Sequence, residues 1–172
     1  MWARAALSIG SLLLLSGMAL AAPPQNFRLR ADPVEVPNLR FVDVEGQPMQ
    51  LRDFRGKVIL LNIWATWCPP CVAEMPTLEA LEFELGGDAF QVLPLSIDKD
   101  GVSVIKPFYN SLGLQELEIY ADETMLAATA LGSLALPTTL LIDAEGNELG
   151  RLVGPAEWNA PEMVEFIKGF ID

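Results

Sequence analysis

Residues 57–71 read KVILLNIWATWCPPC, and this stretch decides the fold. Residues 57–64 form an apolar run of the kind found in a central strand that is covered on both faces. After the second cysteine, apolar residues recur at intervals of three and four over residues 72–85, which predicts an amphipathic helix ended by the Gly86-Gly87 pair. The two cysteines therefore lie where a buried strand passes directly into a helix.

Strands and helices alternate along the rest of the chain and end in a hairpin. This order predicts a mixed α/β sheet with helices on both faces. A short N-terminal hairpin, with strands at 39–44 and 49–51, precedes the central strand. The other expected strands are 90–97, 117–120, 136–142 and 148–153, and the other expected helices are 102–112, 123–131 and 161–171.

The chain before this hairpin has a different character. Residues 5–22 carry no charged side chain and include Ala19-Leu20-Ala21, the small-x-small pattern that signal peptidases accept. We expect residues 1–21 to be a cleaved signal peptide or an N-terminal membrane anchor, so that the folded part lies outside the cytoplasm. The proline-rich residues 22–38 are expected to be a linker, and residues 39–172 a single domain.

Composition narrows the possible chemistry. The net charge of −12 argues against a nucleic-acid partner, because phosphate contacts need clusters of Lys and Arg. The sequence contains no histidine, which excludes histidine-dependent catalytic triads and His-ligated zinc or copper sites. Its two cysteines are too few for a zinc site built from thiolates alone. The remaining options are thiol chemistry or no chemistry at all, and we expect neither a bound metal nor a cofactor.

Cys68 and Cys71 would make a poor structural staple and a good redox switch. A disulfide across two residues removes only about 2 kcal/mol of unfolded-state freedom, against about 4–5 kcal/mol for a bridge that spans a domain. At a helix N-terminus, unpaired backbone N–H groups and the helix dipole favour a thiolate. We expect Cys68 to attack a partner disulfide and the more buried Cys71 to resolve the mixed disulfide. A structural disulfide or half of a metal site are the alternatives.

The two intervening residues, Pro69 and Pro70, bear on the direction of the reaction. They stiffen the turn, have no N–H to offer the Cys68 sulfur, and supply no cation that would strongly stabilise a thiolate. We therefore expect a fairly negative redox potential, which is typical of a reductant.

The segment Trp64–Cys71, WATWCPPC, followed by Glu74-Met75-Pro76, resembles the TlpA/ResA/CcmG group of exported thioredoxin-like proteins. The similarity runs from about Phe41 to Phe170. It includes the D-x-x-G turn at 43–46, Gly56-Lys57, Pro137-Thr138-Thr139 and the I-D-x-x-G turn at 142–146. The resemblance implies a thioredoxin-like three-layer sandwich with an N-terminal β-hairpin and a central insertion.

The resemblance also assigns roles around the cysteines. It implies a cis peptide bond at Leu136–Pro137, although on the residues alone a trans proline at a strand edge is equally compatible. Asn62 stands where ordinary thioredoxins carry a buried acid. Glu74, on the helical face of Cys71, matches an acidic residue of ResA-like proteins. We expect Glu74 to handle the Cys71 proton and keep both thiols protonated; the alternative is a solvated glutamate.

Trp67, beside Cys68, is expected to belong to the surface on which a partner docks, together with Leu136 and Pro137. By family likeness we expect a periplasmic protein-disulfide reductase, and we expect it to be monomeric. Its substrates would be apocytochrome c or copper-delivery proteins for cytochrome oxidase. Its electrons would come from a membrane dithiol donor of the DsbD/CcdA type.

Other functions remain possible on the sequence. A copper(I) carrier could hold its metal on the two thiolates, but no third soft ligand lies near the motif. A thiol oxidant would use the same cysteines in the opposite direction. A peroxidase of the peroxiredoxin group is disfavoured, because Leu61 and Ala65 occupy the positions where that chemistry needs Pro and Thr.

Overall fold

The computed structural model describes residues 23–24, 26–133 and 135–171, and the signal or anchor expected at 1–21 lies outside them. No helix in the described part of the chain has both the length and the apolar content needed to cross a membrane. The strands are β1 (Arg28–Glu35), β2 (Arg40–Val42), β3 (Pro48–Gln50), β4 (Val58–Trp64), β5 (Phe90–Ser96), β6 (Tyr120–Ala121), β7 (Thr138–Ile142) and β8 (Asn147–Val153). The helices are η1 (Leu51–Phe54, 3-10), α1 (Pro69–Leu85), α2 (Val102–Leu112), α3 (Leu126–Ala130) and α4 (Pro161–Lys168).

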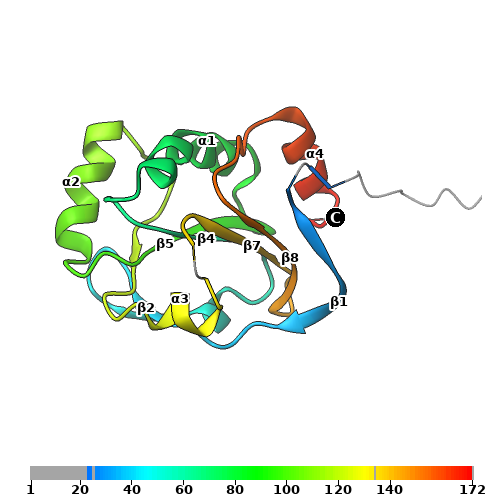
Figure 1. The fold of residues 1–172 in the computed structure, drawn as a ribbon, viewed down its shortest axis with the longest axis horizontal. Coiled ribbons are helices and arrows are strands. Elements are labelled where there is room, and N and C mark those ends of the chain that lie inside the picture. Colours follow the sequence, from blue (N-terminus) through cyan, green and yellow to red (C-terminus); the bar gives the residue numbers. More distant parts are fainter. Residues whose placement is uncertain (1–22, 25, 134, 172) are drawn as a thin grey trace, which may run out of the picture.

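The sheet is built around β4. Its strand order, within the described residues, is β1-β8-β7-β4-β5-β6-β2-β3. β4 pairs in parallel with β5 and antiparallel with β7, so the sheet is mixed. α1 and α4 cover one face and α3 covers the other (Figure 1). The mixed sheet with helices on both faces and the hairpin of β2 and β3 confirm the predictions.

The core includes the whole of β4 and the inner face of α1. All seven residues of β4 are buried, as the apolar run predicted. Met75, Leu78 and Leu81 are fully buried on the inner face of α1. At the end of β4, the ring of Trp64 lies 5.3 Å from that of Phe108 in α2, measured between centroids. α2 and β6 lie between β5 and α3, where they form the expected central insertion.

The expected linker over residues 22–38 is wrong for residues 28–35. These residues form β1, which pairs antiparallel with β8 at the edge of the sheet. All its side chains are exposed, and Pro33 lies inside the strand, a residue that sheets accept mainly at an edge and that favours a linker prediction. The preceding Phe27 is buried, with its ring 5.0 Å from that of Phe166 in α4. The folded unit therefore begins before residue 39.

Two boundaries after β5 also differ from the expected ones, and side chains explain both. The strand expected at 117–120 is reduced to β6, because the Glu79 carboxylate accepts the backbone N–H of Leu117 at 3.0 Å. The helix expected at 123–131 begins at Leu126, because the Asp122 carboxylate accepts the backbone N–H of Ala127 at 2.7 Å. At both boundaries an acidic side chain accepts a backbone N–H that a main-chain carbonyl would otherwise accept.

Gly150 in β8 provides a test of the packing of β1. A methyl group there would lie 2.6 Å from the Arg28 carbonyl oxygen and 3.0 Å from Leu29 Cα. Both are backbone atoms, so β1 would have to move away. We expect Gly150→Ala to lower the free energy of unfolding by about 1–3 kcal/mol, measured by urea denaturation. Gly87→Ala is the control, since a Cβ at that position meets nothing within 4 Å. Equal losses in the two variants would contradict the contact.

Candidate active site

The two cysteines form a disulfide at the start of α1. Cys68 is the N-cap residue, and Pro69 and Pro70 occupy the first turn, where proline fits because no N–H is needed. The Cα atoms of Cys68 and Cys71 are 5.3 Å apart. The backbone N–H of Cys71 donates to the Cys68 sulfur at 3.3 Å. The Cys68 sulfur is therefore held by a helix N-terminal donor, a position that stabilises negative charge on it.

The two sulfurs differ in their access to a partner. Cys71 is completely buried, whereas Cys68 keeps 5% of its surface exposed. Cys68, but not Cys71, lines a pocket of about 610 Å³ beside the start of α1. Apolar residues that share this pocket include Trp67, Ile97, Met125 and Leu136. An incoming sulfur can reach Cys68 from this side, and the expected order of burial of the two cysteines is confirmed.

The residues expected to receive a partner lie around this opening. Trp67 is 63% exposed, and Leu136 lines the pocket. The Leu136–Pro137 peptide bond is cis, as the family resemblance implied. Pro137 itself does not line the pocket. Its carbonyl oxygen accepts the backbone N–H of Gly154 at 2.9 Å, which ties it to the end of β8.

Glu74 lies buried one turn after Cys71, with only 2% of its surface exposed. One carboxylate oxygen accepts the side-chain N–H of Asn62 at 2.8 Å. The other accepts the backbone N–H of Ala156 at 3.0 Å and the indole N–H of Trp158 at 2.9 Å. Burial nevertheless raises the pKa of Glu74 from 4.5 to about 7, because these three donors offset only part of the desolvation. The alternative of a solvated glutamate is therefore wrong.

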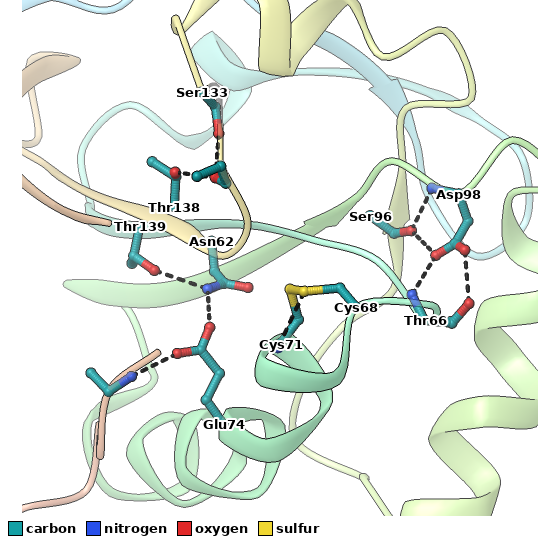
Figure 2. Close-up of a disulfide and its surroundings, with 12 residues drawn as sticks. Asn62, Thr66, Cys68, Cys71, Glu74, Ser96, Asp98, Ser133, Thr138 and Thr139 are labelled. Atoms are coloured by element: carbon teal, nitrogen blue, oxygen red, sulfur yellow. Dashed lines mark hydrogen bonds between the residues drawn. A yellow bond between two sulfur atoms is a disulfide. The ribbon is translucent and has the colours of Figure 1, made fainter. Parts of the chain in front are cut away.

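A carboxyl group with this pKa is suited to proton transfer near neutral pH. Glu74 lies on the Cys71 side of the disulfide (Figure 2) and does not line the pocket. Asn62, which stands in place of the buried acid of thioredoxins, is fully buried and in direct contact with it. The buried acid of this site is therefore on the helix, and its amide partner is on the strand.

Two groups that support this site escaped the sequence analysis. One is Trp158, whose indole N–H donates to the Glu74 carboxylate. Asp98, at the end of β5, accepts hydrogen bonds from the backbone N–H and the hydroxyl of Thr66 at 2.9 and 2.7 Å (Figure 2). Because Thr66 lies two residues before Cys68, Asp98 fixes the segment that enters the active site. The only sequence signal that could have placed Asp98 near Thr66 is that the parallel strands β4 and β5 end at the same edge of the sheet.

The chemistry present at this site is two thiols and one carboxyl group. Among the residues that the structure describes, no group of three or more His, Cys, Asp or Glu side chains is arranged to hold a metal ion. A disulfide between the helix N-cap and the residue three positions later, with one sulfur open to a pocket, can be exchanged with a thiol that enters the pocket.

Comparison with known proteins agrees with this geometry. The family model described as Redoxin matches residues 31–167. The chain belongs to the Redoxin family. ResA, a thiol-disulfide oxidoreductase of Bacillus thuringiensis (strain Al Hakam), is 31% identical over 147 residues, which cover 83% of this chain and 84% of that protein.

Solved structures place this Redoxin-family chain among thioredoxin folds. The exposed lipoprotein thioredoxin Etrx1 of Streptococcus pneumoniae strain TIGR4 has a TM-score of 0.66 at 26% identity, covering 77% of this chain and 99% of that one. A thioredoxin-family thiol:disulfide interchange protein of Chlorobium tepidum TLS has a TM-score of 0.66 at 25% identity, covering 83% and 99%. The TlpA/ResA/CcmG resemblance is confirmed, and the chain is a thiol:disulfide oxidoreductase.

Glu74→Gln should change how the stability of this Redoxin-family protein depends on pH. The native state keeps a proton on Glu74 up to about pH 7, whereas the unfolded chain releases it near 4.5. The wild type should therefore lose stability relative to the variant as the pH rises across this interval, by about 3 kcal/mol in all. Urea unfolding of both disulfide-bonded proteins on either side of the interval measures this loss. A stability difference that stays constant with pH would contradict the buried, high-pKa carboxyl.

Proposed function

We propose that this chain reduces disulfides in exported partner proteins, with Cys68 as the attacking thiol and Cys71 as the resolving thiol. The observation that carries the proposal is the unequal placement of the two sulfurs. Cys68 opens on an apolar pocket, while Cys71 is sealed in the core beside Glu74. Two-step exchange requires one sulfur that the partner can reach and a second, buried sulfur that can attack the first.

The reaction proceeds in two displacements. The Cys68 thiolate attacks one sulfur of the partner disulfide, whose S–S bond breaks; the second partner sulfur leaves and takes up a proton. Cys71 then attacks the Cys68 sulfur of the mixed disulfide and releases the first partner sulfur as a thiol. Glu74 accepts the proton that Cys71 loses, a transfer for which its pKa of about 7 is suited. Two electrons pass from the chain to the partner.

The surroundings of the cysteines favour reduction over oxidation. Strong thiol oxidants depend on a highly stabilised thiolate in their reduced form. Here the segment from Cys68 to Thr77 contains no Lys or Arg, and Pro69 and Pro70 offer no N–H groups. The buried carboxyl of Glu74 opposes a second negative charge on Cys71. The reduced form is therefore not over-stabilised, and it gives up its electrons readily.

Partners of this reductase would dock over the pocket. The exposed indole of Trp67 and the apolar wall at Leu136 suit an extended cysteine-containing segment. In line with the export signal read at residues 1–21, we place the protein in the periplasm, soluble or tethered. Its substrates are apocytochrome c or copper-delivery proteins, and a membrane dithiol donor of the DsbD/CcdA type returns it to the reduced state.

A peptide that carries an oxidised C-x-x-C-H motif tests this function. The reduced protein should convert the peptide to its dithiol form, as followed by mass spectrometry. Cys71→Ser should accumulate a mixed disulfide between Cys68 and the peptide, since no second thiol is present to resolve it. Cys68→Ser is the matched control and should form none, because Cys71 is buried. Oxidation of a reduced peptide by the disulfide form, with no reaction in the other direction, would identify an oxidant and contradict the proposal.

A further inference from the structure

The side chain of Asn62 is only partly satisfied in the disulfide form. It is fully buried in β4. Its amide nitrogen donates both of its hydrogens, to the Glu74 carboxylate at 2.8 Å and to the Thr139 hydroxyl at 2.9 Å. Its carbonyl oxygen Oδ1 has no hydrogen-bond partner among the described residues. A buried polar atom without a partner is costly and calls for an explanation.

The orientation of this amide follows from its neighbours. The nitrogen of Asn62 donates to both Glu74 and the Thr139 hydroxyl, so the oxygen faces away from these two residues. Glu74 lies one turn after Cys71 on α1, so Asn62 lies over the same turn of the helix. Figure 2 shows the free Oδ1 of Asn62 directed towards the sulfur of Cys71.

We propose that Asn62 Oδ1 accepts a hydrogen bond from the Cys71 thiol when the protein is reduced. In the disulfide form the Cys71 sulfur carries no hydrogen, so Oδ1 has no donor there. A dithiol donor supplies two electrons and two protons: its own sulfurs become a disulfide, the Cys68–Cys71 bond breaks, and each cysteine gains an S–H. The S–H of Cys71 is the donor that Oδ1 lacks.

This contact acts on the redox equilibrium. The unpaired oxygen destabilises the disulfide form, and the hydrogen bond relieves that cost in the dithiol form. Asn62 therefore favours reduction of the Cys68–Cys71 disulfide by the dithiol donor. It also keeps the proton on Cys71 until a mixed disulfide forms at Cys68. It is a positioning residue, and its role rests on the proposed function of Cys71 as the resolving thiol.

The S–H stretching band of Cys71 tests the hydrogen bond directly. The protein contains two cysteines, so Cys68→Ala leaves Cys71 as the only thiol. Its infrared band should lie below that of a free alkyl thiol, as expected for a hydrogen-bonded S–H. Adding Asn62→Leu should move the band up to the free-thiol position. The Cys68→Ala protein alone already tests the bond without altering Asn62: a band at the free-thiol frequency would overturn the proposal.

Two control variants distinguish Asn62 from its neighbours. Thr139→Val removes the other partner of the same amide but leaves Oδ1 in place, so the band should not move. Glu74→Gln should also leave the band shifted, because the carboxyl is not the acceptor. A band that reaches the free-thiol position in Glu74→Gln while it stays shifted in Asn62→Leu would assign the hydrogen bond to Glu74 and overturn the proposal.

Redox titration against glutathione measures the consequence in the protein with both cysteines. Asn62→Leu should move the equilibrium towards the disulfide by about tenfold. The shift should persist in the Glu74→Gln background, because it arises from Oδ1. An unchanged equilibrium would contradict the proposed effect. Neither the infrared band nor the redox titration involves a partner protein. Both therefore still test the role of Asn62 if the protein fails to reduce the C-x-x-C-H peptide.

Discussion

The hold of the α1 N-terminus on the Cys68 sulfur is the interaction on which the rest of the structure depends. The N–H of Cys71 reaches that sulfur because β4 delivers the chain straight into the helix, with Pro69 and Pro70 in its first turn. The buried strand cannot slide, since it is paired on both sides by β5 and β7. Cys68 thereby borders the pocket, while Cys71 is completely buried in the core.

A second constraint is the cost of placing a carboxyl group in that core. Glu74 draws on three separate parts of the chain for its hydrogen bonds: Asn62 of β4, and Ala156 and Trp158 of the segment before α4. These bonds compensate incompletely for burial, which is why its pKa rises to about 7. The same contacts fasten α1 to the sheet. A buried carboxyl group of raised pKa and a structural tie are therefore the same side chain.

The sequence predicted the parts of this molecule that are encoded locally. The strand, the helix and the cysteine pair lie within one continuous stretch, and Glu74 lies one turn beyond it. β1 was missed because it lies in a proline-rich segment and because its exposed side chains contribute nothing to the core. Trp158 and Asp98 were missed because each acts on a residue far away in the sequence, 84 and 32 positions distant. Asn62 was noticed as a departure from thioredoxins, but its contacts depend on how the helix packs against the sheet.

The unequal exposure of the two thiols is the central claim, and selective alkylation tests it most directly. Reduced native protein treated briefly with iodoacetamide should carry one label, located on Cys68 by peptide mass spectrometry. The same treatment in denaturant should label both cysteines at similar rates. Equal labelling of Cys68 and Cys71 in the native protein, or faster labelling of Cys71, would contradict the account.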